Sequence, residues 1–420
     1  MKQQSKISLL ILGAGGRGST YANYAAQNPD EVQVVGVAEP RPAYREKMAA
    51  EHHIPVQNVA LDWRDLAERP QMADAVAITM PDALHAEPAI ALARQGYAIL
   101  LEKPMSPTAE DCRRVVEAVN EHGNIFAVCH VLRYTAYTQA LKKLVTSGVI
   151  GDLVCVQHLE PVGYWHDAHS FVRGNWRNLK ESSFMLLSKS CHDIDWLRYI
   201  VGQPCKQVSS FGALTHFKKS QKPAEAGEAL RCLDCAYEAQ CPYSARRLYM
   251  GMHESGKFWW PLDTLTPEPQ NEASVLQALR EGPYGRCVYE CDNDVVDHQV
   301  VSLLYEKDIT ATFTMVAFSE LGHRRTTLFG TRGELRSNGE KIVHFDFLSE
   351  RTEVIDTQAG GADAASGHGG GDYGLMRSFV KAVATGDQSL ILSGAADTLE
   401  THLTTFAAEQ SRLEGRTISL

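Results

Sequence analysis

A glycine-rich turn that directly follows a short apolar run is the sequence feature that most constrains the fold. The run covers residues 6–12, and six residues follow it at once: Gly13, Ala14, Gly15, Gly16, Arg17 and Gly18. GxGxxG between a strand and a helix is typical of dinucleotide binding, because Gly13 permits the tight turn, Gly15 lets the backbone approach a pyrophosphate and Gly18 lets the helix pack on the strand. We expect the pyrophosphate to lie at the N-terminus of that helix, where the helix dipole favours negative charge.

A carboxylate at the end of the next apolar run indicates which dinucleotide the turn would bind. Residues 32–38 form this run, and Glu39 ends it at about the 20-residue distance that dinucleotide-binding sequences show. Such a carboxylate accepts hydrogen bonds from both ribose hydroxyls and would repel a 2′-phosphate, which favours NAD over NADP. Arg41 follows within reach of a 2′-phosphate, so NADP stays open as the less favoured cofactor.

Length, charge and hydropathy bound the class of protein. A chain of 420 residues is too long for one ordinary core and predicts two domains. The formal charge of −10, with no basic run, argues against nucleic acid or a membrane surface as the main partner. We expect no signal peptide before the first strand, and no apolar stretch approaches the roughly 18 residues of a membrane span. A cytoplasmic protein whose ten cysteines are mostly reduced thiols is therefore expected.

The order of strand and helix patterns divides the chain into two predicted domains. Over residues 1–130, apolar strands alternate with helical patterns, which predicts an α/β domain with a doubly wound parallel sheet. Over residues 131–420, strand patterns follow one another with few helices, which predicts an α+β domain on an open, mainly antiparallel sheet. Residues 218–292, rich in Pro, Cys and Tyr, form a predicted insertion. Residues 358–372 are rich in Gly and Ala and predict a loop, with Asp372 as the N-cap of the next helix.

Polar and charged residues follow two of the predicted strands. Residues 102–104 (Glu-Lys-Pro) follow the fourth strand and residues 79–85 follow the third, so both lie at the edge where parallel sheets bind ligands. With the glycine turn, the pair Arg133-Tyr134 and a helix carrying His192 and Asp195, they resemble the glucose-fructose oxidoreductase, inositol dehydrogenase and MocA (Gfo/Idh/MocA) family. The resemblance covers essentially the whole chain apart from the insertion. It implies a Rossmann domain followed by an open antiparallel-sheet domain, with NAD(P) and a sugar-like substrate in the cleft between them.

Lys103 is the first candidate for catalysis. Hydride transfer from a carbinol needs a group near the oxygen that guides proton loss and stabilises developing alkoxide character. A cation at the end of a strand beside the nicotinamide would serve, and the resemblance gives Lys103 this role. A surface lysine before a proline turn is the structural alternative.

A second candidate set lies on the predicted helix around His192. Ser188, His192 and Asp195 are spaced i, i+4 and i+7, so one helix would bring them to one face. Many members of the family carry an aspartate where this chain has Ser188, and a serine cannot act as a carboxylate base at neutral pH. His192, which titrates near neutrality, would then take more of the acid/base work, or Lys189 would supply a second cation.

Other positions are expected to contact the cofactor or the substrate. The further cofactor-binding candidates at the sheet edge are Gly16, Arg17, Thr79, Pro81, His85, Glu102 and His130. The substrate candidates are Tyr134, Tyr164, Trp165, His166, Trp176, Ser188, Asn293 and Asp297. Aromatic faces and hydrogen-bonding tips suit a pyranose, whose C–H faces are apolar and whose rim is polar. For Asn293 and Asp297, turn and cap roles are the alternative.

Five cysteines set the insertion apart. Cys232 and Cys235 form a CxxC, Cys241 follows, and Cys287 and Cys291 come from a returning segment. Four thiolates can hold a tetrahedral structural Zn²⁺, and we expect Cys232, Cys235, Cys241 and Cys287 as ligands, with Cys291 as the substitute fourth. The insertion has too little apolar sequence for a core of its own, so a zinc clip would stabilise its fold. Free thiols are the main alternative, and redox pairing is a further one.

These residues predict an NAD-dependent oxidoreductase that transfers a hydride to or from a ring carbon of a sugar, cyclitol or sugar derivative. The alternative is an NAD-dependent glycoside hydrolase, a chemistry also known in the family. There, oxidation at C3 acidifies the C2 proton, the C1 leaving group is eliminated, water adds and the ketone is reduced again. A non-catalytic cofactor-binding sensor is a third hypothesis, against which Lys103 and His192 argue. An open sheet has to bury its bare face, so a homodimer or homotetramer is expected.

Overall fold

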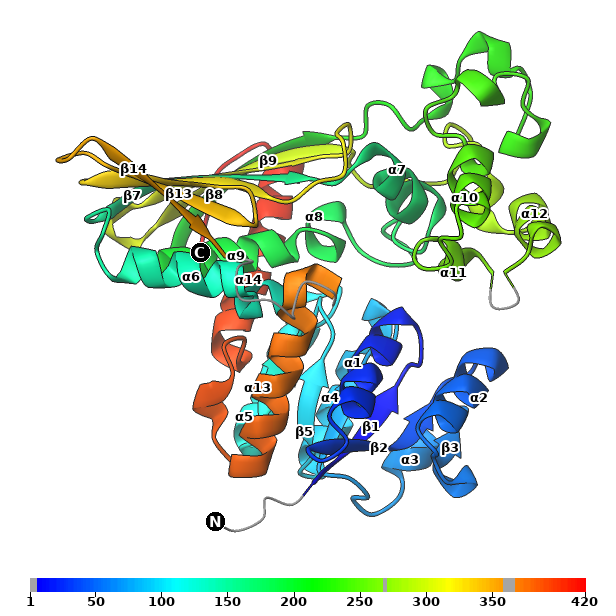
Figure 1. The fold of residues 1–420 in the computed structure, drawn as a ribbon, viewed down its shortest axis with the longest axis horizontal. Coiled ribbons are helices and arrows are strands. Elements are labelled where there is room, and N and C mark those ends of the chain that lie inside the picture. The colour runs from blue at the N-terminus through cyan, green and yellow to red at the C-terminus, as the bar shows by residue number, and fades with distance from the viewer. Residues whose placement is uncertain (1–5, 267–269, 358–366) are drawn as a thin grey trace.

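The computed structural model describes residues 6–266, 270–357 and 367–420, and its N-terminal part is a six-stranded sheet (Figure 1). The strands are β1 (Ile7–Leu12), β2 (Val32–Ala38), β3 (Val59–Ala60), β4 (Ala75–Ile78), β5 (Ala98–Leu101) and β6 (Phe126–Val128). They pair in the order β3-β2-β1-β4-β5-β6, and every pair is parallel. The connecting helices are α1 (Gly16–Gln27), α2 (Pro42–Glu51), α3 (Arg64–Ala67), α4 (Ala86–Arg94) and α5 (Ala109–His122). This arrangement confirms the predicted doubly wound α/β sheet.

The first sheet is buried on both faces because its strands carry apolar side chains at consecutive positions. Leu9 and Ile11 of β1 belong to one hydrophobic core, whereas Leu10 and Leu12 belong to the core on the other face. The four residues of β4 are all buried. Helices over both faces leave the ends of the strands for ligands, and the strand order reverses between β1 and β4 at the carboxyl edge.

A nine-stranded sheet forms the second part of the molecule. Its strands are β7 (Leu153–Pro161), β8 (Cys205–Ala213), β9 (His298–Tyr305), β10 (Thr310–Val316), β11 (Arg325–Gly330), β12 (Gly333–Ser337), β13 (Lys341–Asp346), β14 (Arg351–Asp356) and β15 (Ile418–Ser419). They pair in the order β14-β13-β12-β11-β7-β10-β9-β8-β15. β7 and β10 pair in parallel, and the other described pairs are antiparallel. The predicted open, mainly antiparallel sheet is confirmed.

Helices cover one face of the second sheet and leave the other open. The covering helices are α6 (Ala136–Thr146), α9 (Cys191–Val201) and α14 (Ala395–Glu414) (Figure 1). Leu197 of α9 and Phe313 of β10 are fully buried in the core between them. Phe211 and Val300, which face each other across β8 and β9, are exposed on the bare side. No helix in the described ranges has both the length and the apolar character needed to cross a membrane.

The C-terminal segment joins the two domains. Helix α13 (Gly371–Thr385) returns to the first sheet, where Leu375 and Phe379 share a core with Leu9 of β1. At the start of α13, a Cβ on Gly371 would lie 2.4 Å from the carbonyl oxygen of Val131, so only glycine allows this close approach. Helix α14 then packs on α5 of the first domain and on α9 and β8 of the second.

The structure partly describes the loop predicted before α13. Residues 358–366 lie outside the described residues. Gly367–Gly370 forms a short 3-10 turn, and Gly370, in a left-handed conformation, is the N-cap of α13. The expectation that Asp372 caps this helix is wrong, because Asp372 lies inside the first turn.

The insertion between β8 and β9 forms a helical lobe (Figure 1). Its helices are α10 (Ala245–Glu254), α11 (Leu262–Leu265) and α12 (Glu272–Glu281). Its small core contains Cys232, Ala245, Tyr249, Met250, Leu262, Val275, Leu279 and Tyr284. The expectation that the insertion has no core of its own is therefore wrong, because helical spacing gathers scattered apolar side chains on inner faces, as with Val275 and Leu279.

Candidate active site

The glycine turn has the geometry of a phosphate-binding loop. Gly13 has a φ of +96°, and a Cβ there would lie 2.8 Å from the carbonyl oxygen of Thr79. A Cβ on Gly18 would lie 2.0 Å from the carbonyl oxygen of Gly13, so α1 can pack against the strand end only without a side chain. The N-cap of α1, Gly15, makes no side-chain cap, which leaves the first backbone N–H groups of the helix without a side-chain acceptor. Such N–H groups suit a diphosphate.

Glu39 ends β2 as a buried, ionised carboxylate. It accepts a hydrogen bond from the backbone N–H of Ala14, over 2.9 Å, and from the Nε of Arg41, over 2.8 Å. Burial would raise the pKa of Glu39, but hydrogen bonds from Arg41 outweigh it and lower the pKa. Arg41 itself stacks over Tyr44, at 4.0 Å from the ring centre. A fixed anion beside the turn suits an acceptor of ribose hydroxyls.

Arg17 has a different role from the cofactor contact expected for its side chain. Its Nε donates to Glu102 over 2.6 Å, and its Nη2 donates to Tyr21 and to Asp372. Burial would raise the pKa of Asp372, but the hydrogen bond from His368 and the charge of Arg17 outweigh it and lower the pKa to about 2. This network joins α1, the end of β5 and α13. No local pattern could predict this network, because Asp372 lies far from Arg17 along the chain.

Lys103 follows β5 at the carboxyl edge of the sheet. Its Nζ donates to the backbone carbonyl of Ser188 over 2.7 Å, and its backbone N–H donates to Glu102 over 2.7 Å. Glu102 therefore fixes the turn rather than presenting its carboxylate to a ligand. Lys103 is held by a neutral carbonyl oxygen, so its positive charge is not neutralised by that partner.

The segment after β4 packs against the glycine turn and the lysine turn. Thr79 donates its hydroxyl to the Gly13 carbonyl over 2.6 Å, and Pro81 is exposed at the start of the turn Asp82–Leu84. His85 is fully buried, with its two ring nitrogens 2.8 Å from the carbonyl oxygens of Met80 and Pro104. Both ring nitrogens lie against carbonyl oxygens, so His85 holds the two turns together. This buried side chain therefore does not face the cofactor, in contrast to what we expected from the sequence.

Four histidines meet near Lys103, and we call them the histidine cluster: His130, His192, His368 and His402. The His192 ring lies 5.7 Å from that of His130 and 6.0 Å from that of His368, and the His130 ring lies 5.5 Å from that of His402. Burial lowers the pKa of His130 to about 3, and burial together with Lys103 lowers that of His192. Both ring nitrogens of His130 and the Nδ1 of His192 are buried and lack hydrogen-bond partners in the described chain. The rings of His130 and His192 are therefore neutral, and their unpartnered nitrogens can form hydrogen bonds with a ligand.

Behind the histidine cluster, charged groups are paired. Asp195 accepts two hydrogen bonds from Arg133, over 2.6 and 2.7 Å, and its Oδ1 lies 3.6 Å from the Nε2 of His130. Tyr134 was expected to contact the substrate. Its buried hydroxyl instead contacts the Ser393 hydroxyl over 2.9 Å and accepts from the Leu392 backbone N–H over 3.0 Å. Tyr134 therefore stabilises the junction between the domains.

The predicted single helix around His192 is interrupted. Helix α8 (Met185–Ser188) ends before α9 begins at Cys191, so Ser188 and His192 do not share one helix face. The Ser188 hydroxyl donates to the Phe184 carbonyl over 3.3 Å, and Ser188 reaches the site only through its own carbonyl. Lys189 pairs with Glu160 over 2.8 Å, so it is not the free second cation that was expected.

The aromatic loop predicted to contact the substrate continues into the insertion. Tyr164, Trp165 and His166 lie on α7 (Tyr164–Asp167), and a π-helical turn, Ala168–Arg173, follows. The sequence reasoning missed Trp260 of the insertion, whose ring lies 5.5 Å from Trp165 and 4.8 Å from His166. Three consecutive aromatic residues, Phe258 to Trp260, were the available signal.

Three further substrate candidates lie in different settings. Trp176 is 36% exposed and its ring lies 6.1 Å from that of Phe171. Asn293 donates to the Phe217 carbonyl over 3.0 Å. Asp297 is buried and accepts from the backbone N–H groups of Thr215 and His216, over 2.7 and 2.8 Å. Asp297 therefore fixes the chain where the insertion begins, which is the turn role left open above.

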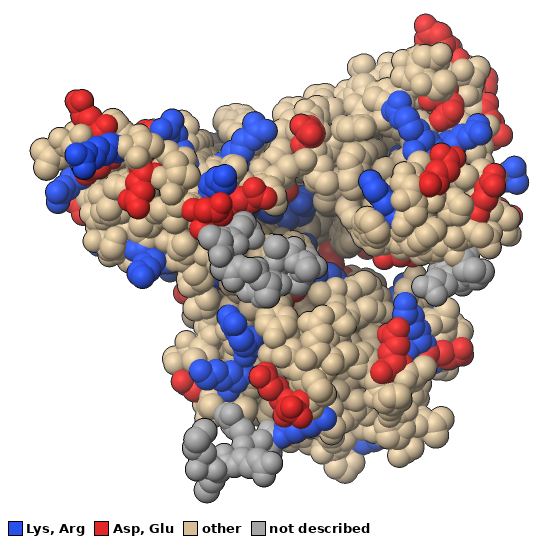
Figure 2. All heavy atoms as spheres, in the orientation of Figure 1, with Lys and Arg blue, Asp and Glu red and all other residues tan. Residues whose placement is uncertain are grey.

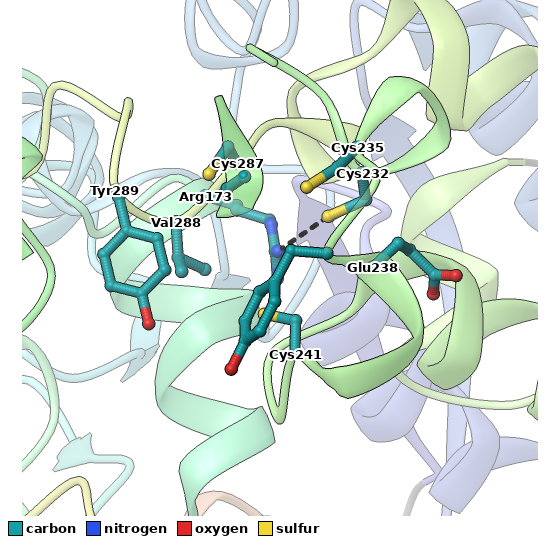
Figure 3. Close-up of a pocket in the computed structure, with 10 residues that line it drawn as sticks. Arg173, Cys232, Cys235, Glu238, Cys241, Cys287, Val288 and Tyr289 are labelled. Carbon is teal, nitrogen blue, oxygen red and sulfur yellow. Dashed lines mark hydrogen bonds between the residues drawn. The ribbon is translucent and has the colours of Figure 1, made fainter. Parts of the chain in front are cut away.

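The cysteines of the insertion surround a guanidinium group. Cys232, Cys235, Cys241 and Cys287 line one small pocket, and Figure 3 shows Arg173 lying between Cys287 on one side and Cys232 and Cys235 on the other. The Nη2 of Arg173 donates to the Cys232 sulfur over 3.5 Å and to the Tyr243 carbonyl over 2.8 Å. Among the residues that the structure describes, no three His, Cys, Asp or Glu side chains form a metal-binding group. The zinc expectation is thus not supported, and one of the expected ligands, Cys232, instead accepts a hydrogen bond from the buried guanidinium of Arg173.

The surface is hollowed between the first domain and the insertion, with acidic and basic side chains at the edges of the hollow (Figure 2).

Two family models match nearly the whole chain. Residues 7–130 match the model described as "Oxidoreductase family, NAD-binding Rossmann fold", and residues 142–420 match the family's C-terminal alpha/beta domain.

Relatives of this chain act on sugars and cyclitols. The 2,7-anhydro-N-acetylneuraminate hydratase of Mediterraneibacter gnavus is 28% identical over 188 residues, which are 45% of this chain and 47% of that protein. The inositol 2-dehydrogenase of Rhizobium meliloti is 27% identical over 210 residues, 49% of this chain and 58% of that protein. The chain thus spans less than two thirds of the length of these curated relatives. A levoglucosan dehydrogenase in complex with NADH and levoglucosan has a TM-score of 0.72 at 18% identity and 99% coverage of each chain, which shows a shared fold.

Proposed function

The chain belongs to the Gfo/Idh/MocA family of NAD-binding oxidoreductases, and we propose that it oxidises or reduces a ring carbon of a sugar, cyclitol or sugar derivative with NAD as the cofactor. The observation that carries the proposal is the position of Lys103, which follows β5 and lies beside the histidine cluster at the carboxyl edge of the first sheet. The named activities of the relatives, on inositol and on an anhydro sugar acid, support the substrate class.

The residues at the sheet edge fit a dinucleotide. The uncapped start of α1 offers backbone N–H groups to a diphosphate, and Glu39 offers an ionised acceptor to ribose hydroxyls. A 2′-phosphate would meet the same carboxylate, which supports NAD rather than NADP. NAD, when bound, accepts a hydride from the ring carbon or returns one.

Lys103 and His192 divide the work on the substrate oxygen. The Lys103 ammonium, held by the Ser188 carbonyl, stabilises negative charge that develops on this oxygen. Neutral His192 has an unpartnered Nδ1 and accepts or returns the hydroxyl proton. Lys189, paired with Glu160, is a positioning residue for the segment between α8 and α9.

A redox-neutral elimination is the second candidate. It needs a base for the proton at C2, and His130 offers two buried ring nitrogens that have no hydrogen-bond partner in the described chain. The match to a hydratase of an anhydro sugar acid also favours it. In this route the ring is oxidised at C3, the C1 group leaves, water adds and the ketone is reduced again.

One assay separates the two candidates. The purified protein is incubated with NAD and either free sugars and inositols or nitrophenyl glycosides. Stoichiometric formation of NADH with a free sugar or an inositol supports the dehydrogenase. Release of nitrophenol without net NADH supports the elimination route, and the loss of both signals in a protein that still binds NAD would contradict both.

We also propose that the bare face of the second sheet is the contact surface of a homodimer or homotetramer. Phe211 is 69% exposed there, next to exposed Val300 on the neighbouring strand. Exposed apolar patches of this kind mark protein contacts. Size-exclusion chromatography with light scattering tests this: Phe211→Asp should lower the mass to that of one chain. A wild-type protein that is already monomeric would overturn it.

A further inference from the structure

We propose that the insertion adds a second carbohydrate subsite to the cleft, and that this subsite binds a sugar residue that carries a carboxylate. A pocket of about 310 Å³ lies between α7 and helix α10 of the insertion. This volume is at the lower end of the roughly 300–1,000 Å³ that small-molecule sites have, and suits one sugar ring. The pocket is separate from the cysteine-lined pocket, although Arg173 contributes to both.

Aromatic side chains from two parts of the chain form walls of this pocket. Tyr164 and Trp165 come from α7, and Tyr243 comes from the insertion. The Tyr164 and Tyr243 rings lie 6.3 Å apart at an angle of 62°. Neither hydroxyl has a hydrogen-bond partner within the described residues. The pocket therefore offers apolar faces for C–H groups and hydroxyls for a sugar rim.

The charge of the pocket is positive and uncompensated. Arg247 and Lys257 line it, and no Asp or Glu does. Arg247 donates through Nη2 to the Cys241 carbonyl over 2.7 Å, but neither Arg247 nor Lys257 has an ion-pair partner among the described residues. In a chain with a formal charge of −10, a lining with Arg247, Lys257 and the hydrogen-bonded Arg173, and with no carboxylate, is selective for an anion. A guanidinium binds a carboxylate through two parallel hydrogen bonds, so we assign the anion to a uronate-type carboxylate.

Helix α7 connects this pocket to the candidate active site. Tyr164 and Trp165 line the pocket, while the next residue, His166, is buried and its pKa is lowered by burial and by the charge of Lys189. Lys189 follows Ser188, whose carbonyl binds Lys103. In the proposed binding mode, the reacting ring lies at Lys103 and an acidic neighbouring unit of the same substrate lies in the pocket. The role of the subsite in turnover rests on the proposed function, whereas its binding of an acidic sugar does not.

Calorimetric titration of the full-length protein tests the subsite, with methyl β-D-glucuronide and methyl β-D-glucoside as the two probes. We expect the glucuronide to bind at least about tenfold more tightly, since its carboxylate accepts charge-assisted hydrogen bonds that the glucoside cannot replace. The double variant Arg247→Ala/Lys257→Ala should lose this difference. The matched control is Arg246→Ala, an exposed cation on the same helix that does not line the pocket, and it should bind as the wild type does.

Two further arms keep the outcome unambiguous. Lys103→Ala should keep the glucuronide affinity, so a failed turnover assay and a failed subsite remain distinguishable. Equal affinity for the two probes, undetectable binding of the glucuronide, or unchanged binding in the double variant would each overturn the proposal. Methyl β-D-glucoside 6-sulfate is the last probe: binding tighter than that of the glucuronide would overturn the carboxylate assignment in favour of a sulfated sugar.

Discussion

Cations that lie at the two ends of the cleft differ in whether a carboxylate of the protein pairs with them. At the nucleotide end, Arg17 pairs with Glu102, and Arg41 pairs with Glu39, in each case against a buried carboxylate. At the insertion end, Arg247 and Lys257 line a pocket without any such partner in the described chain. Paired cations hold secondary-structure elements in place, because their charge and hydrogen bonds are used within the protein. Unpaired cations leave their charge for a ligand.

Lys103 is the exception at the nucleotide end. Its Nζ has no carboxylate partner in the described chain and donates to a backbone carbonyl instead. Lys189, close by in sequence to the carbonyl that holds Lys103, is paired with Glu160. The sequence offered Lys103 as the first catalytic candidate and Lys189 as a candidate second cation, and among the described residues the structure gives a carboxylate partner to Lys189 alone of the two. The predictions below start from this pair.

The largest effect is expected from removing the Lys103 ammonium. Lys103→Met should lower kcat/KM by about a thousandfold, because general acid–base and electrostatic assistance together contribute about 10²–10⁴. The affinity for NAD should remain nearly unchanged, as measured by fluorescence titration. The matched variant Lys189→Met should lower kcat/KM by less than about tenfold, since Lys189 acts through position. A larger loss in Lys189→Met than in Lys103→Met would reverse the assignment.

The next effect concerns what holds the insertion together. Leu279 is fully buried in the small core of the insertion. The substitution Leu279→Ala should lower the free energy of unfolding by about 2–5 kcal/mol. Leu230→Ala, at a residue of the insertion that is 63% exposed, should change it by less than about 0.5 kcal/mol. Chemical denaturation measures both. Prolonged dialysis against a chelator should leave the midpoint of unfolding unchanged. A clear fall in this midpoint would indicate that a metal stabilises the insertion.

A smaller effect follows from the contacts that Asp372 makes with His368 and Arg17. The hydrogen bond from His368 and the charge of Arg17 lower the pKa of Asp372 to about 2, against an ordinary value of about 3.9, so this pair of contacts stabilises the fold fully above about pH 4 and is lost as the pH falls through about 2. Asp372→Asn should lose about 2 kcal/mol at neutral pH and depend less on pH in the acid range. Unfolding midpoints measured against pH give this result. Parallel pH curves for the two proteins would show that the pair does not contribute.

The smallest effect tests the anion beside the glycine turn. Glu39→Gln removes the charge that would repel a 2′-phosphate, so the ratio of the Kd for NADP to that for NAD should fall by about tenfold, or about 1.4 kcal/mol. Glu46→Gln, at an exposed residue of α2, is the control and should leave the ratio unchanged. An unaltered ratio in Glu39→Gln would mean that another group selects the cofactor.

Local patterns were sufficient where neighbouring residues build the structure. The turn from Gly13 to Gly18 and the carboxylate at Glu39 lie within one strand–helix–strand unit, so spacing alone predicted both. The same is true of the two sheets, whose class follows from the alternation of strands and helices. Local patterns left the role of Asp297 undecided and predicted the wrong contact for Tyr134, because what their polar atoms contact depends on segments distant in the chain.

By itself, the sequence determined the class of each domain and the glycine turn, since these depend on short-range geometry and on the hydrophobic period. Its resemblance to the family, together with a position after a predicted strand, singled out Lys103. Only the tertiary structure decided which charged groups are free to act. Arg17, Lys189 and Arg173 are occupied by Asp372, Glu160 and the groups around the cysteines, whereas Lys103, Arg247 and Lys257 have no carboxylate partner in the described chain. The physical reason is that a charge is neutralised by its neighbours in space, and the sequence does not state which residues these are.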